Sequence, residues 1–254
     1  MVLAVDIGNT NIVLGGFEGD KILFRERVST NTSSTDLEYA TAFKMALNVH
    51  DYNSSMLDGA IISSVVPSVT NTVKRAIEKY AGVNVMVVGP GIKTGLSILI
   101  DNPAQLGSDL AVDAVAGINE YPVPQIIIDM GTATTLSVID KNKNYLGGTI
   151  MTGMGVSTEA LTARTSQLPK IAFEVPKKVI GTNTIDCMKS GIMYSNACAI
   201  DGLVERIEEE LGEKCTVIAT GGLAGVVTSL CKKKIILDDD LLLKGLMIIY
   251  NKNV

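Results

Sequence analysis

The sequence predicts an α/β protein that is built twice from one structural plan. In each half an apolar strand ends at Asp-x-Gly and a run of small polar residues follows, at Val2 to Thr10 and again at Ile126 to Thr135. After each of these corners a second strand leads through a polar turn into a third strand. Because the order of these features repeats, we expect the chain to contain an internal duplication.

The predicted elements follow similar orders in the two halves. Apolar spacing predicts three strands, a helix, a strand and a helix in the first half, at residues 2–5, 12–14, 22–24, 36–49, 57–67 and 68–82. In the second half it predicts three strands, two helices, a strand and a terminal helix, at residues 126–128, 136–139, 145–150, 158–165, 190–212, 215–222 and 241–253. This pattern is typical of two ribonuclease-H-like lobes, which we expect to face each other across a cleft. Pro122 and Pro124 interrupt the chain between them, so the lobes are predicted at residues 1–120 and 121–254.

The composition excludes several functional classes. With 254 residues, 46% of them hydrophobic, the chain is globular, and its formal net charge of −5 gives no basic surface for nucleic acid or anionic membranes. No basic leader or apolar run long enough to span a membrane is present, so we expect a cytoplasmic protein. The four cysteines are scattered, which favours buried thiols over a disulfide or zinc framework.

The two corners predict a site for a polyphosphate. Glycine lets the backbone approach a ligand, small hydroxyls and amides donate hydrogen bonds to anionic oxygens, and an Asp at a strand end can hold a hydrated divalent cation. One such corner also fits an ordinary tight turn, whereas a pair, one in each half, favours a nucleoside triphosphate held between two lobes. The sequence contains neither a P-loop motif nor a dinucleotide-binding fingerprint. A kinase is therefore the favoured class.

A further predicted helix after Pro103 carries two carboxylates. Asp109 and Asp113 lie one turn apart, and either could be part of an ordinary solvated helix face. A carboxylate near a phosphate site could also accept the proton of an alcohol that attacks the γ-phosphoryl group. Asp109 is the better candidate because it follows Gly107 and Ser108 at the start of the helix.

Five motifs in order resemble the type III pantothenate kinases of the acetate-kinase, sugar-kinase, chaperone and actin superfamily. They are D-x-G-N-T-N, D-N-P-x-x-x-G-x-D, D-x-G-T-A-T-T, "GGTIMTGM" and "GTNTIDCMKSGI", and they span nearly the whole chain. The resemblance implies phosphorylation of pantothenate by ATP, the first step of coenzyme A biosynthesis. It also implies a cytoplasmic homodimer that requires Mg²⁺ or another divalent cation, together with K⁺ or NH₄⁺.

The resemblance also implies roles for individual residues. ATP would be bound by Asp6, Ile7, Gly8, Asn9, Thr10, Asn11, Ile12, Val13 and Thr132. Asp6 would lie near the divalent metal, Asp129 would hold the monovalent cation, and Asp109 would be the general base. The substrate would be bound by Ile100, Gly107, Ser108, Asp109, Leu110 and Thr184, the last from the partner subunit. Thr184 could alternatively only cap a helix that begins at Asp186.

Three positions depart from the family pattern. Ile100 and Leu110 replace a Tyr and an Arg, and Asp113 replaces an Asn. An Arg would pair with an anionic substrate, which Leu cannot do, so either the pocket uses another cation, for example Lys93 or Arg164, or the preferred substrate differs. The alternatives to a pantothenate kinase are a kinase for another alcohol and an ATP-binding regulator without catalytic activity.

Overall fold

The computed structural model describes residues 1–254, which form two compact units. Unit 1 comprises Met1–Gly95, Ala104–Ala116 and Leu241–Val254, and unit 2 comprises Leu96–Pro103 and Gly117–Asp240. The lobe boundary at residue 120 stays a prediction from the sequence. The contacts within the chain group the C-terminal helix with the N-terminal residues, because this helix packs on the first sheet.

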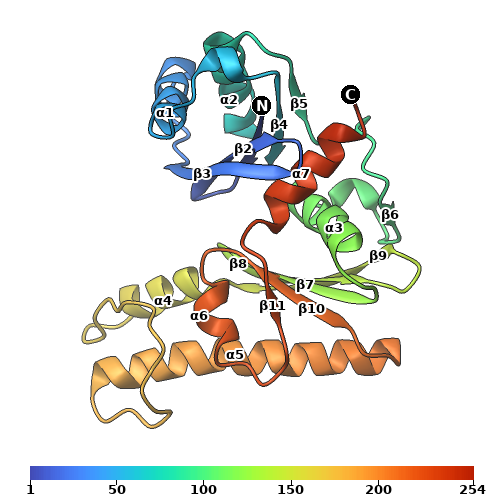
Figure 1. The fold of residues 1–254 in the computed structure, drawn as a ribbon. Helices are drawn as coiled ribbons and strands as arrows, with labels where there is room; N and C mark the ends of the chain where they lie inside the picture. Colours follow the sequence, from blue (N-terminus) through green and yellow to red (C-terminus); the bar gives the residue numbers. More distant parts are fainter. The chain divides into compact units, whose positions relative to one another are not determined.

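Unit 1 contains a five-stranded sheet in the order β3-β2-β1-β4-β5 (Figure 1). β1 pairs with β2 in antiparallel and with β4 in parallel orientation, so the chain makes a three-stranded meander before it crosses over to β4. The strands are β1 (Val2–Ile7), β2 (Asn11–Glu18), β3 (Lys21–Ser29), β4 (Gly59–Ser64) and β5 (Val85–Val87).

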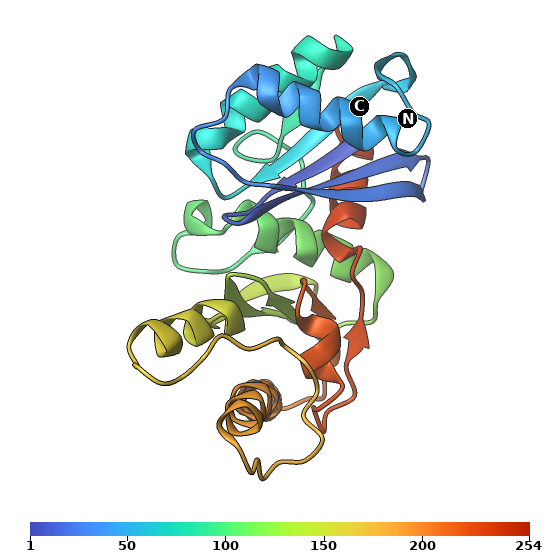
Figure 2. The ribbon, with the colours of Figure 1, turned by 90° about the vertical axis from the view of Figure 1, so that its left-hand side faces the viewer.

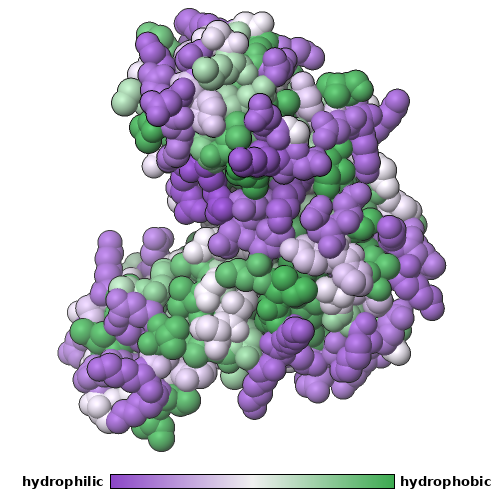
Figure 3. Space-filling model, in the orientation of Figure 1, coloured by the Kyte–Doolittle hydropathy of each residue, from purple (hydrophilic) through white to green (hydrophobic).

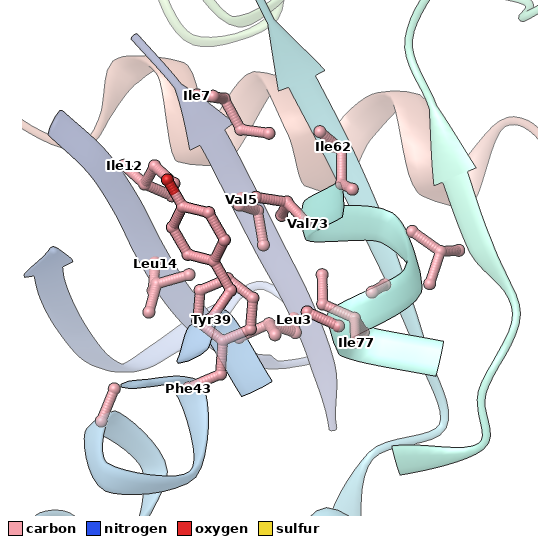
Figure 4. Close-up of a cluster of buried hydrophobic side chains, with 14 of the residues drawn as sticks. Leu3, Val5, Ile7, Ile12, Leu14, Tyr39, Phe43, Ile62, Val73 and Ile77 are labelled. Atoms are coloured by element: carbon pink, nitrogen blue, oxygen red, sulfur yellow. The ribbon is translucent and has the colours of Figure 1, made fainter. Parts of the chain in front are cut away.

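Helices cover both faces of this sheet. Helices α1 (Asp36–Asn48) and α2 (Pro67–Ala81) pack on the face formed by Leu3, Val5 and Ile7. Figure 4 shows these side chains on the same side of the sheet as Phe43 from α1 and Val73 and Ile77 from α2, all of them buried in one cluster. Helix α7 (Leu241–Asn251) packs on β1 and β4. Burial of these apolar side chains is the main stabilising contribution to unit 1.

Unit 2 repeats the strand order of unit 1. Its sheet runs β11-β10-β7-β8-β9-β6, in which β9-β8-β7-β10-β11 corresponds strand for strand to β3-β2-β1-β4-β5, and β6 adds a parallel strand beside β9. The strands are β6 (Ser97–Ile98), β7 (Gln125–Met130), β8 (Ala133–Ile139), β9 (Asn144–Thr152), β10 (Thr216–Thr220) and β11 (Ile236–Leu237). The predicted duplication of a ribonuclease-H-like plan is therefore confirmed.

The long helix α5 (Thr184–Leu211) packs along one face of this second sheet (Figures 1 and 2). Helices α4 (Met154–Ala163) and α6 (Ala224–Thr228) contact it. α5 begins six residues before the predicted position, and its cap is Asn183, whose side chain accepts a hydrogen bond from the amide of Asp186. The alternative that Thr184 caps this helix is therefore wrong, because Thr184 is already its first residue.

The outer side of α5 leaves two thiols exposed. Cys187 and Cys198 are exposed, whereas Cys215 and Cys231 are half-buried, and all four are free. The prediction of buried cysteines is therefore wrong for the first two, since α5 covers the sheet with only one of its sides. None of the helices combines the length and the apolar character that crossing a lipid bilayer requires.

Helix α3 (Ser108–Glu120) follows a single 3₁₀ turn at Pro103–Gln105 and is more buried than its sequence pattern predicts. Asp113 is only 1% exposed, so the alternative that it belongs to a solvated helix face is wrong. Helix α7 approaches α3 closely at the preceding residue, since a Cβ atom on Gly245 would lie 2.2 Å from the carbonyl oxygen of Val112.

Candidate functional site

The first corner, residues 6–13, connects β1 to β2 and is called the β1 corner below. The amide of Gly8 donates to the carbonyl of Asn11 (3.0 Å), and Thr30 binds the same turn through its hydroxyl, which donates to the carbonyl of Gly8 (2.6 Å). The side chains of Asn9 and Thr10 are exposed. The corner is thus a fixed turn that presents small polar groups to solvent.

The predicted ATP-binding residues of this corner divide into two kinds. Ile7 and Ile12 are fully buried in the core of unit 1, so only their backbone atoms are available to a ligand. Asp6, Gly8 and Asn11 are half-buried and can offer polar atoms. The described residues contain no cluster of three or more His, Cys, Asp or Glu side chains that could hold a metal ion. A single carboxylate such as Asp6 nevertheless fits Mg²⁺ in a kinase, because that ion keeps several waters and takes its other ligands from substrate phosphates.

A hydroxyl group fastens the start of α3 to the end of β4. Ser108 Oγ donates to the carbonyl of Ser64 (2.9 Å), accepts from the amide of Ser64 (3.1 Å) and lies 3.1 Å from Ser63 Oγ. We call these three residues the serine latch. Ser63 is fully buried, so its hydroxyl needs a partner within the protein, and Ser108 provides one. These bonds hold the first turn of α3 against the end of β4.

The serine latch brings the predicted base to the same sheet edge as the β1 corner. Asp6 and Ser63 are register partners on the parallel strands β1 and β4, so their side chains share one face near the ends of the two strands. Asp109 follows the latch directly. A Cβ on Gly107 would lie 2.4 Å from Asp109 Oδ1, so glycine is the residue that leaves room for this carboxylate.

The surroundings of Asp109 make it a stronger base. Burial raises the pKa of its carboxyl group above the ordinary value, and hydrogen bonds from the amide of Leu110 (2.8 Å) and from its own amide lower it only in part. A carboxylate with a raised pKa binds a proton more strongly, which suits a group that removes a proton from an alcohol.

The second corner, residues 129–135, connects β7 to β8 and is called the β7 corner. The amide of Gly131 donates to the carbonyl of Ala133 (3.0 Å), and the amide of Gly153 donates to that of Thr132 (3.1 Å). The side chain of Thr132 is exposed. Gly221, at the end of β10, has a φ of +97°, and a Cβ there would lie 2.6 Å from Asp129 Oδ1. The carboxylate therefore lies over the end of β10, where no side chain at residue 221 would fit.

The remaining predicted substrate residues belong to other elements of the chain. Ile100 follows β6, and its Cγ2 atom would lie 3.8 Å from a Cβ on Gly147 of β9. Thr184 is exposed at the start of α5, where it lines an open groove of about 680 Å³. Lys93 and Arg164, the candidate cations, are both exposed.

Sequence reasoning missed Thr30 and the pair Ser63–Ser64. Thr30 follows β3 by one residue and reaches the β1 corner only after the meander has formed. The two serines end an otherwise apolar strand, and hydroxyl residues at the end of a parallel strand are the signal that could have indicated them.

Comparison with known proteins shows the family. A family model described as type III pantothenate kinase matches residues 2–206. The type III pantothenate kinase of Halalkalibacterium halodurans is 43% identical over 254 residues, which is all of both chains. Those of a Geobacillus species and of Brevibacillus brevis are each 44% identical, over all of this chain and 98% and 99% of theirs.

Solved structures share the fold at low identity. A putative Baf family transcriptional activator from Campylobacter jejuni superposes with a TM-score of 0.62 at 17% identity, over 99% of this chain and 98% of its own. Component A of (R)-2-hydroxyglutaryl-CoA dehydratase from Acidaminococcus fermentans has a TM-score of 0.56 at 16% identity, over 98% and 96%. From the full-length similarity to its curated relatives we conclude that the chain belongs to the type III pantothenate kinase family.

Proposed function

We propose that the chain transfers the γ-phosphoryl group of ATP to the primary hydroxyl of pantothenate. The product is 4′-phosphopantothenate, and the reaction is the first step of coenzyme A biosynthesis. Full-length similarity to type III pantothenate kinases supports the reaction. The observation in the structure that carries the proposal is Asp109, which is fixed by the serine latch at the sheet edge that bears the β1 corner.

Asp109 is the general base of this reaction. Its carboxylate accepts the hydroxyl proton while the hydroxyl oxygen forms a bond to the γ-phosphorus, and the bond from that phosphorus to the β,γ-bridging oxygen breaks to release ADP. Backbone amides and the polar side chains of the β1 corner, among them Asn9 and Thr10, bind the phosphates. Asp6 holds the divalent cation, which when bound neutralises phosphate charge. Catalysis of this kind depends mostly on position, which the latch supplies.

The β7 corner supplies the second set of ATP contacts. Thr132, with its exposed hydroxyl, contacts ATP, and Asp129 holds the monovalent cation, K⁺ or NH₄⁺. This role is supported by the position of the Asp129 carboxylate, which fills the space that the missing side chain of Gly221 leaves open.

The substrate is bound by Ile100, Gly107, Leu110 and Asp109. Leu110 cannot pair with the carboxylate of pantothenate, so one of the exposed cations, Lys93 or Arg164, takes that role. The hydroxyl of Ser108 is engaged in the latch, so its contribution is to position Asp109.

A coupled assay of ADP release tests the proposed activity. With ATP, Mg²⁺ and either K⁺ or NH₄⁺, pantothenate should be turned over far better than a panel of other alcohols. Equal turnover of unrelated polyols would favour the kinase for another alcohol. ATP binding without acceptor-dependent ADP release, unchanged in Asp109→Asn, would favour the regulator without catalytic activity.

The active form is proposed to be a homodimer in which Thr184 reaches the partner's site. Helices α4 and α5 and the segment between them expose apolar residues, and Figure 3 shows hydrophobic residues in green on the surface of this region. They include Val156, Leu161, Val179, Ile180 and Ile185. Exposed apolar surface of this kind is typical of protein contacts.

Complementation between two inactive variants tests this arrangement. Asp109→Asn and Thr184→Val should each be impaired alone. A mixed dimer, however, contains one site with neither lesion, so an equal mixture that exchanges subunits should recover about a quarter of the wild-type rate. No recovery in a mixture that sedimentation shows to be dimeric would contradict the shared site.

A further inference from the structure

Asp129 lies in a row of three oxygen-bearing side chains that crosses the second sheet. It is the register partner of Thr135 on the antiparallel strand β8 and of Thr220 on the parallel strand β10. The neighbouring residues Ile128, Leu136 and Ala219 pack on the face that α5 covers. Because side chains alternate along a strand, Asp129, Thr135 and Thr220 all lie on the opposite face.

The hydroxyl of Thr135 requires a partner that the protein does not provide. Its Oγ1 atom is shielded from solvent and has no hydrogen-bond partner. A buried hydroxyl in this condition is destabilising unless something binds it. Thr220, on the other side of Asp129, is only 5% exposed.

The end of β10 is shaped around the carboxylate. A Cβ on Gly221 would lie 2.6 Å from Asp129 Oδ1 and 2.7 Å from the amide nitrogen of Met130. Any larger residue would therefore occupy the space of the carboxylate. The carboxylate is consequently held beside Thr220, the residue before this glycine.

We propose that Thr135 and Thr220 complete the monovalent cation site of Asp129. Side chains directly opposite each other on neighbouring strands have Cβ atoms roughly 5 Å apart, so their oxygens can converge on one ion. One carboxylate balances a single positive charge, and neutral oxygens replace water around K⁺ or accept hydrogen bonds from NH₄⁺. This inference rests on the proposed function, which places the cation at Asp129.

The chain offers a matched control at the next residue. Thr134 is fully buried, and its hydroxyl also has no hydrogen-bond partner. It pairs with Met130 and Met151, and it lies on the face of the sheet that α5 covers. Thr134→Val and Thr135→Val therefore make the same chemical change on opposite faces.

The experiment compares the variants Thr134→Val, Thr135→Val and Thr220→Val with the wild type. The melting temperature of the ligand-free protein is measured as K⁺ replaces Na⁺ at constant ionic strength, because an ion that binds only the folded state raises it. The K⁺ concentration for half-maximal kinase activity is measured separately. Thr135→Val and Thr220→Val should raise both K⁺ midpoints by at least about tenfold, and Thr134→Val should leave both unchanged. In Na⁺ alone, the variants at 134 and 135 should melt no lower than the wild type, since each removes a hydroxyl without a partner.

Unchanged midpoints in Thr135→Val and Thr220→Val, or an equal shift in Thr134→Val, would overturn the inference while Asp129→Asn could still abolish K⁺ binding. A wild type that K⁺ does not stabilise more than Na⁺ would overturn both the inference and the cation at Asp129. Turnover of pantothenate in that protein would still support the proposed kinase. Absence of turnover together with the expected K⁺ midpoints for the melting temperature would contradict the kinase and leave the cation site supported.

Discussion

Substitution of Ser108 by Ala tests whether the serine latch positions Asp109, the proposed base. The change removes one oxygen atom, which donates to the carbonyl of Ser64, accepts from its amide and lies 3.1 Å from Ser63 Oγ. The backbone of α3 can remain helical, since alanine is the best helix former. What is lost is the connection between α3 and the end of β4.

The hydrogen bonds of Ser108 set the loss of stability and of kcat that we expect from this substitution. The fully buried hydroxyl of Ser63 loses its bond to residue 108, and the amide of Ser64 loses an acceptor. At about 1–2 kcal/mol for each such group, Ser108→Ala should lower the free energy of unfolding by about 2–4 kcal/mol. A shift of roughly 1 Å in a catalytic group can lower a rate about 100-fold, so kcat should fall by about 10- to 100-fold. The KM for ATP should change little, because the β1 corner keeps its own hydrogen bonds.

Urea unfolding and steady-state kinetics measure these two effects, and Thr70→Val is the matched control. The hydroxyl of Thr70, in helix α2, forms hydrogen bonds with Ser64 Oγ (2.7 Å) and with the carbonyl of Val66 (3.0 Å), and neither bond involves α3. This variant should therefore lose stability but keep its kcat. If Ser108→Ala were as stable and as active as the wild type, or if both variants lost kcat equally, the positioning role of the latch would be refuted.

Three further substitutions separate catalysis from stability. Asp109→Asn should lower kcat at least about 100-fold. It should also melt at a higher temperature than the wild type near neutral pH. Because the pKa of Asp109 is raised in the folded protein, the wild type loses stability as pH rises through the folded-state pKa, and the variant does not. The difference in melting temperature should vanish in acid. Glu208→Gln should cost about 2–4 kcal/mol and leave kcat unchanged, since Glu208 is 7% exposed and accepts from Lys233 (2.9 Å). Burial raises the pKa of Glu208, but its hydrogen bonds lower the pKa by a larger amount, so the net shift is downward. The stabilisation that Glu208 contributes is therefore present at neutral pH and should be lost as pH falls through the folded-state pKa. Tyr121→Phe should cost about 1.5–3 kcal/mol by removing the hydroxyl that donates to Asp238 (2.8 Å). Burial and then Asp238 raise the pKa of Tyr121 to about 12, so this cost should be constant in melting curves across neutral and moderately alkaline pH.

The fold could be predicted from the sequence because each half of the duplication shows the same local sequence patterns. Strand, polar corner and turn occur in the same order at Val2 and at Ile126, and those patterns need no long-range information. The start of α5 was predicted too late because Thr184, Ile185 and Asp186 are weaker helix formers than many of the residues that follow. The signal of Asn183 followed three residues later by Asp186 was present and marks the true start.

The sequence indicates the candidate site only where one segment contains its residues. The β1 corner and Asp109 stand in short motifs, and the structure places them at one sheet edge. The link between Ser64 and Ser108 spans 44 residues and depends on how α3 packs, which no local pattern contains. The close approach of Gly245 in α7 to Val112 in α3 likewise joins segments that are far apart in the chain.

The duplication also accounts for the different roles proposed for two equivalent carboxylates. Asp6 and Asp129 both lie on the first strand of their sheets, and each has one register partner on the following strand and one on the parallel neighbour. For Asp6 these partners are Val13, which has no polar side-chain atom, and Ser63, whose hydroxyl is engaged with α3. The first sheet therefore offers one carboxylate and little else, which suits a divalent ion that keeps its own water.

For Asp129 the corresponding partners are Thr135 and Thr220, so the same topology offers a carboxylate between two hydroxyls. A site that strips water from its ion needs such neighbouring oxygens, and a monovalent ion loses its water at lower cost than a divalent ion of similar size. Replacing Val13 by Thr would test whether a hydroxyl beside Asp6 changes the ion that the β1 corner prefers. The hydroxyl would be introduced beside Asp6, and if neighbouring oxygens decide which ion a corner prefers, the Mg²⁺ concentration for half-maximal activity should become sensitive to added K⁺. An Mg²⁺ requirement that K⁺ leaves unchanged in Val13→Thr would show that the register partners do not set the choice of ion.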